Sequence, residues 1–376
     1  MRLKVLAAIL LLAATRPVLA QQGSLAAAVA PFVEKQSLAG AVMLVSDKER
    51  DLAIETAGFA DIANRKPMRA DTLFWIASQS KPITAAALMI LVDEGKVRLD
   101  DPVEKFLPEF KGQMVVAEKG KDRMVLKSPA RQATVRDCLN HTSGMPFKSA
   151  LEEPTLDTLS LATGVRSHAL TPLEAEPGSR YRYSNAGINT AGRIVEVISG
   201  MPFEAFLDKR LLRPLGMTDT TFWPAEAQAA RLALSYRPDA AKTGLQATPI
   251  IQLRYPLSDK SRGAMPAGGL FATATDCSRF CRMILNGGVH EGRRILSEES
   301  VKALTTRQTP SSMKESYGLG FAVGPDTAGH GGAHATSMGV NFKTGRITVW
   351  MVQHAGFPAD GAQARGAFEK AAALVK

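Results

Sequence analysis

The stretch Ser78-Gln79-Ser80-Lys81-Pro82-Ile83-Thr84-Ala85-Ala86-Ala87-Leu88-Met89-Ile90-Leu91 decides the fold of this chain. It predicts a helix that begins near Ser78, because proline is tolerated in the first turn of a helix and the residues that follow are good helix formers. Ser78 and Lys81 lie three positions apart and therefore share a face of that helix. A lysine with a depressed pKa beside a serine hydroxyl is the arrangement of a lysine-activated nucleophile.

The same spacing occurs a second time, in Ser311-Ser312-Met313-Lys314. This second copy follows Thr309-Pro310 in a polar stretch and has no apolar helix behind it, so it is predicted to be a surface loop. A serine and a lysine at this spacing also fit an ordinary solvated helix start. The context favours Ser78 as the nucleophile.

The first twenty residues have the layout of a secretory signal peptide. Arg2 and Lys4 precede an apolar run from Val5 to Ala14, and small residues end at Ala20. A buried or membrane helix is the alternative, but the run is too short to span a bilayer and Arg16 with Pro17 interrupts it. We therefore expect a periplasmic or secreted protein, without an integral membrane span once residues 1–20 are removed.

The overall composition excludes several classes of function. The 376 residues carry a formal net charge of +10 and only 6% aromatic residues, and the basic residues are spread along the chain. Nucleic-acid binding is therefore not expected. The three cysteines and six histidines form no zinc-binding spacing, so no metal and no other cofactor is predicted. The cysteines are expected to be small apolar core residues, and whether any two form a disulfide stays open.

Strand patterns occur at both ends of the chain, with helices between them. This order predicts one antiparallel sheet formed where the two ends of the chain meet, with a helical region inserted. Expected strands cover residues 40–46, 51–57, 317–323, 333–342 and 347–354. Expected helices cover residues 24–36, 134–140, 189–199, 203–212, 276–285 and 362–375.

A serine and lysine pair also needs a group that moves protons. Tyr183-Ser184-Asn185 is the only Tyr-x-Asn in the chain and leads into a predicted helix. A tyrosine beside a cationic lysine is able to ionise, so Tyr183 is predicted to act as a base for Ser78 and then as an acid for the leaving group. Asn185 is suited to orient Lys81 and the substrate. Alternatively, Asn185 caps the helix and Tyr183 packs beneath it.

The third candidate element is Gly329-His330-Gly331-Gly332-Ala333, placed before a predicted strand. Glycines such as Gly332 allow a substrate to approach the backbone closely. The N–H groups of Ser78 and Ala333 are predicted to bind an oxyanion. His330 is expected to donate a hydrogen bond to Tyr183 or to substrate. A glycine-rich turn or bulge is the structural alternative.

Taken together, these elements resemble the superfamily of serine β-lactamases and penicillin-binding proteins, in its class C, esterase and D-peptidase branch. The resemblance covers nearly the whole chain after residue 20 and includes four further motifs: Leu99-Asp100-Asp101-Pro102-Val103, Thr134 to Met145, Leu212-Arg213-Pro214-Leu215-Gly216-Met217 and Pro266-Ala267-Gly268-Gly269-Leu270. It implies an acyl-enzyme on Ser78 without metal or organic cofactor.

The same resemblance implies an α+β fold of the β-lactamase type. An antiparallel five-stranded sheet flanked by helices is expected, with an inserted, mostly helical region. The domains implied are an α/β sandwich made of residues 21–77 and 265–376 and a helical domain of residues 78–264. The active site is expected between them.

One departure from the family pattern concerns substrate choice. Many β-lactamases carry Lys-Thr-Gly on the inner strand, where it helps to bind the β-lactam carboxylate. Here Lys343-Thr344-Gly345 lies between two predicted strands and indicates a hairpin turn, so that His330-Gly331-Gly332 stands at the motif position. This replacement implies weaker carboxylate binding and favours an esterase or D-peptidase over an efficient β-lactamase.

The sequence thus predicts an exported serine hydrolase that is esterase-like and acts on small esters, amides or cell-wall peptides. A D-amino-acid peptidase, a DD-peptidase and a β-lactamase are the alternatives of the same class, and a non-catalytic envelope sensor is the alternative of another class. An α/β-hydrolase triad is excluded, because no Asp or Glu lies between Ser337 and His354. The natural substrate and the oligomeric state stay open.

Overall fold

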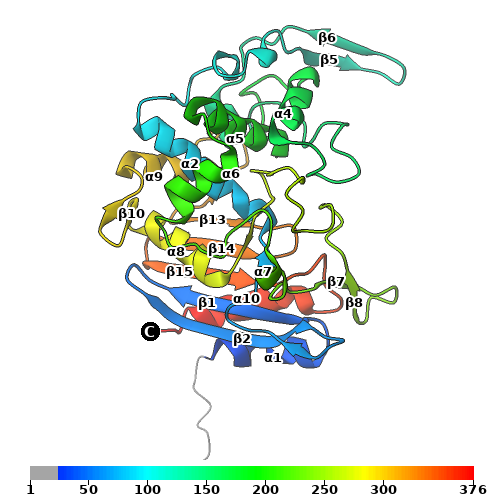
Figure 1. Cartoon of the computed structure of the whole chain (residues 1–376), viewed down its shortest axis with the longest axis vertical. Helices are drawn as coiled ribbons and strands as arrows, with labels where there is room; N and C mark the ends of the chain where they lie inside the picture. Colours follow the sequence, from blue (N-terminus) through cyan, green and yellow to red (C-terminus); the bar gives the residue numbers. More distant parts are fainter. Residues whose placement is uncertain (1–23) are drawn as a thin grey trace, which may run out of the picture.

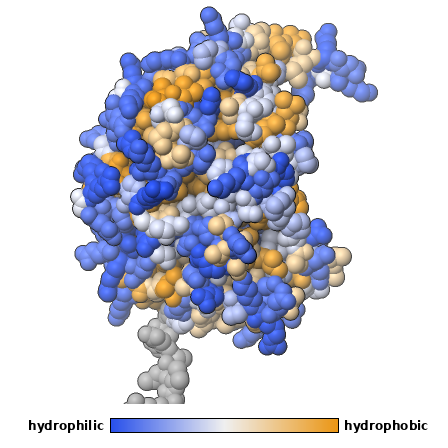
Figure 2. Space-filling model, in the orientation of Figure 1, coloured by the Kyte–Doolittle hydropathy of each residue, from blue (hydrophilic) through white to orange (hydrophobic). Residues whose placement is uncertain are grey.

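The computed structural model describes residues 24–376 (Figure 1). The signal peptide predicted for residues 1–20 lies outside these residues. None of the helices within residues 24–376 is long and apolar enough to cross a membrane. On the face seen in Figure 2, hydrophilic residues surround separate hydrophobic patches, as expected for charge spread along the chain.

A seven-stranded sheet is the largest element of the fold. Its strand order is β12-β13-β14-β15-β1-β2-β3, with every pair antiparallel. The strands are β1 (Gly40–Ser46), β2 (Asp51–Asp61), β3 (Lys66–Pro67), β12 (Ala322–Val323), β13 (Thr327–Gly331), β14 (Ser337–Asn341) and β15 (Arg346–Met351). Because β1 pairs with β15, the prediction that both ends of the chain build one sheet is confirmed.

The helices are α1 (Leu25–Glu34), α2 (Ser80–Asp93), α3 (Val135–Leu139), α4 (Leu161–Leu170), α5 (Asn185–Ser199), α6 (Phe203–Leu207), α7 (Glu226–Ala229), α8 (Ala274–Leu285), α9 (Glu298–Thr305) and α10 (Ala364–Ala372). A π-helical turn, Asp208–Leu212, extends α6. Four two-stranded ribbons complete the fold: β4 (Phe74–Trp75) with β9 (Phe271–Ala272), β5 (Val115–Lys119) with β6 (Met124–Lys127), β7 (Ser235–Pro238) with β8 (Leu245–Thr248), and β10 (Val289–His290) with β11 (Arg293–Arg294).

The prediction of five strands was wrong, and the error has two sources. The edge strand β3 has only two residues and carries no detectable alternation. Of the predicted strand 317–323, only the two residues of β12 belong to the sheet. The predicted strand 333–342 is in fact β14, and the preceding strand β13 has the composition Thr-Ala-Gly-His-Gly, which lacks the β-branched residues typical of strands. A Cβ on Gly329 would lie only 2.5 Å from Met338 O, so close pairing with β14 requires glycine there.

The sheet is covered on both faces, and β1 shows this most clearly. All seven residues of β1 are buried. Val42 and Leu44 belong to the large core that includes α2 and α8, whereas Met43 and Val45 pack with residues of α1 and α10. A strand buried on both faces has a continuous apolar sequence instead of an alternating one. Cys138, Cys277 and Cys281 are buried, as expected, and all three are free.

Helix α2 connects the sheet to the helical part of the molecule (Figure 1). Every residue from Ser80 to Leu91 is buried. A helix that is apolar around its whole circumference belongs inside a core and not on a surface. The fold therefore fixes the N-terminus of α2, and with it Ser78, next to the end of β13.

Two buried histidines, His334 and His354, lie close to the strand that precedes Ser78: the ring centre of His334 is 5.0 Å from that of Trp75. His334 Nδ1 lies 2.8 Å from Ser235 Oγ and 3.1 Å from Gln353 Nε2. The backbone N–H of Ala39 donates to His354 Nε2 at 3.1 Å. Burial lowers the pKa of His334 and the pKa of His354 to about 4 each. Both rings are therefore neutral in the folded protein near neutral pH.

We expect the folded protein to lose stability as the pH falls from about 7 to about 5. The unfolded chain binds protons at histidine below a pKa of about 6.5, whereas the folded pKa of His354 is lower, so protonation favours unfolding. Each such histidine reduces the free energy of unfolding by up to about 1.4 kcal/mol per pH unit in this window. Thermal denaturation at several pH values measures the effect. His354→Gln should reduce the slope, and an unchanged melting temperature over this range would contradict the expectation.

Candidate active site

Ser78 lies in a short 3₁₀ turn, Ala77–Gln79, that leads directly into α2. Its side chain is partly exposed, while its neighbours Ala77 and Gln79 are buried. Ala77 has φ +46°, a left-handed conformation that costs free energy for a residue with a Cβ. The fold thus retains strain beside the candidate nucleophile, which is a feature that clusters at functional sites.

Lys81 is fully buried, and its Nζ contacts three neutral oxygen atoms. It lies 3.0 Å from Ser78 Oγ, 2.8 Å from Asn185 Oδ1 and 2.7 Å from Ala267 O. Burial lowers the pKa of Lys81 well below its usual value. No carboxylate forms an ion pair with Lys81 among residues 24–376. The structure therefore favours the neutral amine.

The three contacts also fix where the lone pair of that amine points. A neutral amine donates two hydrogen bonds and accepts one. Asn185 Oδ1 and Ala267 O only accept, so they take the two N–H groups. The lone pair is left for the Ser78 hydroxyl, which is the one partner able to donate. This arrangement places a base against the proton that Ser78 must lose.

Helix α5 positions Asn185 through its first residues. The prediction that this helix starts at residue 189 was wrong, because Ser184 caps it: the Ser184 side chain accepts the N–H of Gly187 at 3.0 Å. Ser184, not Asn185, is thus the cap, and Asn185 is free to accept from Lys81. One turn later, Asn189 Oδ1 accepts the N–H of Ala267 at 2.9 Å.

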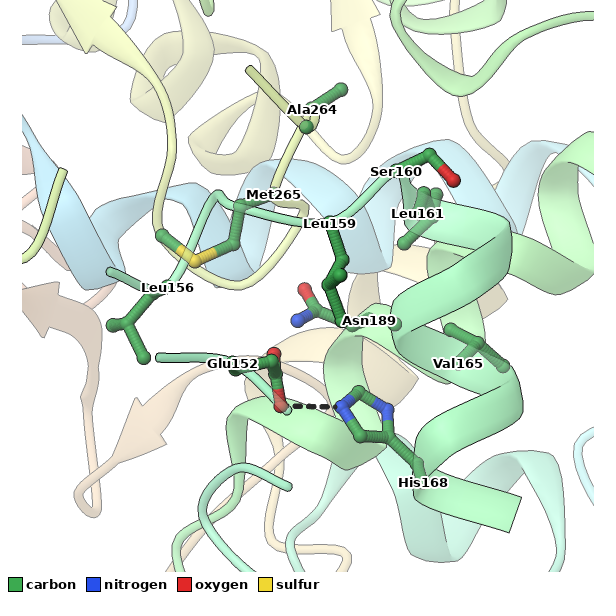
Figure 3. Close-up of a pocket in the computed structure, with 12 residues that line it drawn as sticks. Glu152, Leu156, Leu159, Ser160, Leu161, Val165, His168, Asn189, Ala264 and Met265 are labelled. Carbon is green, nitrogen blue, oxygen red and sulfur yellow. Dashed lines mark hydrogen bonds and ion pairs between the residues drawn. The ribbon is translucent and has the colours of Figure 1, made fainter. Parts of the chain in front are cut away.

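Hydrogen bonds from α2 and from β4 hold the segment around Ala267 in place. Thr84 Oγ1 donates to Pro266 O at 2.8 Å, and Trp75 Nε1 donates to Gly268 O at 2.7 Å. A small cavity lies behind Asn189 and is lined by the buried pair of Glu152 and His168, whose Oε2 and Nε2 lie 2.8 Å apart (Figure 3). Ser78 does not line that cavity, so the Glu152 and His168 pair lies near Asn189 but does not reach the candidate nucleophile.

Tyr183 lies beside both Lys81 and Ser78. The Lys81 Nζ is 4.6 Å from the centre of the Tyr183 ring. Burial raises the pKa of Tyr183 to about 12, and a hydrogen bond with the Ser78 side chain opposes this only in part. The electrostatics therefore do not favour the predicted ionised tyrosine as base. They favour a neutral phenol that is available as a proton donor.

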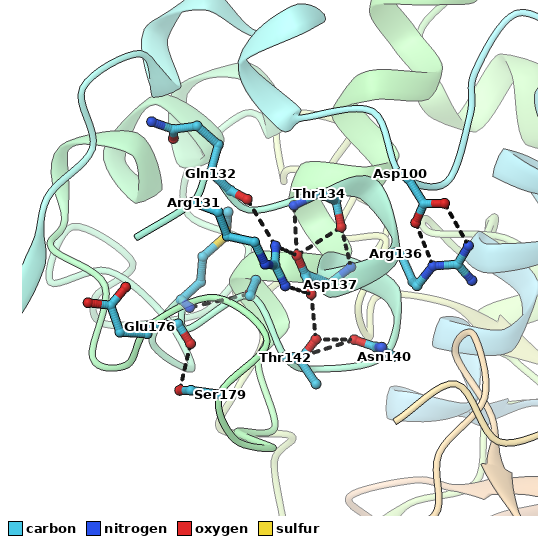
Figure 4. A network of polar contacts seen from close by, with 12 residues as sticks. Asp100, Arg131, Gln132, Thr134, Arg136, Asp137, Asn140, Thr142, Glu176 and Ser179 are labelled. Carbon is cyan, nitrogen blue, oxygen red and sulfur yellow. Dashed lines mark hydrogen bonds and ion pairs between the residues drawn. The ribbon is translucent and has the colours of Figure 1, made fainter. Parts of the chain in front are cut away.

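A polar network holds the loop behind Tyr183 in place (Figure 4). The side chain of Asp137 accepts from the N–H of Thr134 at 2.9 Å and from Thr142 Oγ1 at 2.7 Å, and it pairs with Arg131. Next to Thr142, His141 accepts the N–H of Ser184 at its Nδ1, 3.2 Å away. The pKa of His141 is lowered, chiefly by burial, which keeps this acceptor neutral.

The glycine-rich element forms the end of β13 and the start of the turn that leads into β14. Thr336 Oγ1 donates to Ile76 O at 3.4 Å, and Gly332 N–H donates to Thr336 O at 2.8 Å. These bonds bring Gly332 next to the segment that carries Ser78. Ala333 follows in the turn between β13 and β14 and is itself exposed. Its N–H as an oxyanion donor stays a prediction.

Gly332→Ala should reduce kcat/KM of the hydrolysis predicted for Ser78 by about 10- to 100-fold without unfolding the protein. A Cβ at this position would overlap Thr336 Oγ1 and Ile76 O, and would push the end of β13 away from Ser78. Gly331→Ala is the matched control, since its Cβ would meet only Thr336 O at an ordinary 3.6 Å. Steady-state kinetics of both variants, with circular dichroism for folding, measure the difference. Equal losses in the two variants would contradict this account.

The hydrogen-bond partner of His330 differs from the one predicted. His330 Nε2 lies 2.9 Å from Tyr317 Oη, and His330 Nδ1 lies 2.6 Å from Gly331 O. The ring centre of His330 is 6.1 Å from that of Tyr183, and no hydrogen bond joins the two. His334, four residues after His330, has different partners, Ser235 and Gln353.

Sequence reasoning missed four residues of the site: His141, Asn189, Ala267 and Tyr317. Ala267 belongs to a motif that carried the family resemblance but had no assigned role. The second Ser-x-x-Lys copy, Ser311 to Lys314, lies in a surface loop, as predicted. Lys343 lies in the turn between β14 and β15, also as predicted.

The comparisons with known proteins agree with this geometry. The family model Beta-lactamase matches residues 25–373, so the chain belongs to the Beta-lactamase family and is a serine hydrolase of that family. Protein Rv1367c of Mycobacterium tuberculosis (strain ATCC 25618 / H37Rv) is 36% identical over 302 residues, which cover 76% of this chain and 73% of that protein.

Two further relatives have names that state an activity or a ligand. Esterase EstB of Burkholderia gladioli is 34% identical over 54% of this chain and 52% of its own length. Penicillin-binding protein 4 of Amycolatopsis lactamdurans is 33% identical over 70% of this chain and 66% of its own length.

Solved structures share the fold. EstCE1, a hydrolase with promiscuous acyltransferase activity, aligns with a TM-score of 0.76 at 21% identity, covering 93% of this chain and 97% of its own. Unliganded selenomethionyl simvastatin synthase from Aspergillus terreus aligns with a TM-score of 0.78 at 20% identity, covering 92% of this chain and 96% of its own. The expected β-lactamase-like fold is thus confirmed.

Proposed function

We propose that this chain is an exported esterase that forms an acyl-enzyme on Ser78. The observation that carries the proposal is the buried Lys81 Nζ, 3.0 Å from Ser78 Oγ and otherwise held by two acceptors. In this mechanism Ser78 Oγ attacks the ester carbonyl while its proton passes to Lys81. The N–H groups of Ser78 and Ala333 receive the oxyanion.

The proton then returns through Tyr183. The neutral phenol of Tyr183 protonates the departing alkoxide, and the Lys81 ammonium restores the phenol proton. Acylation of Ser78 is then complete, and Lys81 and Tyr183 have returned to their starting protonation states. Water attacks the acyl group in the second half, with Lys81 again taking the proton. Asn185 keeps Lys81 in place throughout.

The esterase assignment rests on the absence of a positive charge on His330 at the end of β13. A peptidase that removes a terminal D-amino acid, like a β-lactamase, must accommodate a substrate carboxylate near this edge. His330 presents a neutral ring there, whose pKa is lowered to about 4 mainly by burial. The similarity to Esterase EstB supports the same choice. Relatives named as putative D-alanyl-D-alanine carboxypeptidases keep the D-peptidase as the second candidate.

A parallel assay tests the proposal. Purified protein is incubated with p-nitrophenyl acetate, p-nitrophenyl butyrate, nitrocefin and a D-Ala-D-Ala peptide, and kcat/KM is compared with Ser78→Ala as control. We expect ester turnover to dominate. Dominant nitrocefin or peptide cleavage would contradict the esterase assignment. Absence of labelling by a fluorophosphonate probe in the unsubstituted protein would favour the non-catalytic alternative.

Export is a separate part of the proposal. Cell fractionation of a host that expresses the whole chain, with N-terminal sequencing of the product, tests it. We expect a product in the periplasm or medium that begins near Gln21, because small residues precede that position. A cytoplasmic product that retains residues 1–20 would contradict export.

A further inference from the structure

The contacts of His330 determine its tautomer. Its Nδ1 lies 2.6 Å from Gly331 O, and a carbonyl oxygen only accepts hydrogen bonds. Nδ1 must therefore carry the proton. A neutral imidazole has one donor and one acceptor, so Nε2 accepts, and the donor is the Tyr317 hydroxyl 2.9 Å away. Both ring nitrogens of His330 are thus engaged within the protein.

The groups packed around this pair keep it in that state. Burial is the main cause of the lowered pKa of His330, and Lys81 from α2 would oppose a positive charge on His330 whenever Lys81 itself is protonated. The other neighbours with ionisable groups are phenols and an imidazole, from Tyr181, Tyr183 and His141. The one carboxylate that acts on this cluster is Glu315, and it acts on Tyr181. Burial raises the pKa of Tyr317 well above its usual value, which keeps its hydroxyl protonated as a donor.

We propose that Tyr317 is a positioning residue that holds His330 as a neutral hydrogen-bond acceptor at the end of β13, so that the acyl site selects acyl groups without a carboxylate. The substrate-class part of this inference rests on the proposed ester hydrolysis. His330 lies on β13 two residues before Gly332, whose N–H donates to Thr336 O, and Thr336 Oγ1 donates to Ile76 O, two residues before Ser78. With Nε2 turned toward Tyr317, it offers an anionic acyl group neither charge nor a free N–H.

NMR of the histidine side chains tests the positioning role without any assay of turnover. Long-range ¹H–¹⁵N spectra of the full protein distinguish the two tautomers, and His330→Gln identifies the resonances. We expect neutral His330 with its proton on Nδ1 at about pH 6. In Tyr317→Phe, loss of the donor to neutral Nε2 should raise the pKa of His330. A protonated His330, or an Nε2–H tautomer, in the unsubstituted protein would overturn the proposal.

Matched esters test the selectivity. The probes are p-nitrophenyl valerate and mono-p-nitrophenyl glutarate, whose acyl chains have similar length but differ by a carboxylate. We expect the kcat/KM ratio of the neutral to the anionic ester to stay constant in the unsubstituted protein as the pH falls from about 8 to about 5.5. In Tyr317→Phe the ratio should fall about 10-fold over this range, because protonated His330 then attracts the carboxylate.

Two controls separate this role from simple packing. Tyr181 belongs to the same aromatic cluster, 5.7 Å from Tyr317 between ring centres, so Tyr181→Phe should leave the ratio unchanged. In a His330→Gln background, Tyr317→Phe should no longer change the ratio, as a double-mutant cycle requires. An equal effect of Tyr317→Phe in both backgrounds would overturn the proposal. Failure of the unsubstituted protein to hydrolyse the neutral ester would instead contradict the proposed function, and the tautomer measurement would still decide the role of Tyr317.

Discussion

Lys81→Met should lower kcat for ester hydrolysis by about 10³- to 10⁴-fold while the protein stays folded. Methionine keeps the length and apolar character of the side chain but removes the amine that receives the proton of Ser78. The partners left behind, Asn185 Oδ1 and Ala267 O, lose one hydrogen bond each, so a moderate loss of stability is also expected. Burst and steady-state kinetics with p-nitrophenyl butyrate measure the chemical step.

A matched lysine provides the control for this prediction. Lys343 belongs to a Lys-Thr-Gly triplet but lies in the turn between β14 and β15. Lys343→Met should therefore leave kcat/KM within about 2-fold, as expected for a surface change. The unsubstituted protein should also lose activity at low pH, because protonated Lys81 cannot accept a proton and its pKa is lowered. Near-normal turnover by Lys81→Met would refute Lys81 as the base.

Tyr183→Phe should lower kcat/KM for alkyl esters by about 10²- to 10⁴-fold, the range of general acid catalysis. Because the pKa of Tyr183 is raised to about 12, its phenol keeps its proton and is available to the departing alkoxide. A p-nitrophenolate leaves without needing that proton. The loss should therefore be much smaller with p-nitrophenyl butyrate than with ethyl butyrate.

The dependence on the leaving group is the decisive measurement for Tyr183. Equal losses for the aryl and the alkyl ester would contradict the role of Tyr183 as acid and would fit the ionised base that the sequence pattern suggested. The Tyr181→Phe variant again provides the control, since it removes a neighbouring phenol whose ring centre lies 5.6 Å from His141. It should affect both esters alike and weakly.

The contact between Ser78 and Lys81 was more predictable from the sequence than the contacts that surround it. Ser78 and Lys81 lie three residues apart on one helix, so local spacing alone brings them together. Tyr317 and His330 are thirteen residues apart and meet only because β12 and β13 pair at the sheet edge. No local pattern encodes such a contact. The pKa of Tyr183 likewise depends on burial by residues from several elements, which a motif does not specify.

The fold shows the same division between local and long-range information. The apolar runs of β1 and β15 and the helix pattern that begins at Ser78 allowed these elements to be placed in advance, whereas α4, α7 and α9 were not predicted. The two-residue strand β3 and the glycine-containing strand β13 have no strand pattern of their own and are defined by pairing with their neighbours. The start of α5 was misplaced because Ser184 acts as a cap within a stretch that was interpreted as a loop.

The complete burial of α2 has a consequence for how this protein loses activity on heating. Ser78 lies just before α2, a helix that is buried along almost its whole length. The backbone amides of α2 should therefore exchange hydrogen only when the whole core opens. Ser78, the proposed nucleophile, therefore adjoins the most slowly exchanging unit of the molecule. Heat inactivation should therefore coincide with global unfolding instead of preceding it through local opening of the catalytic helix.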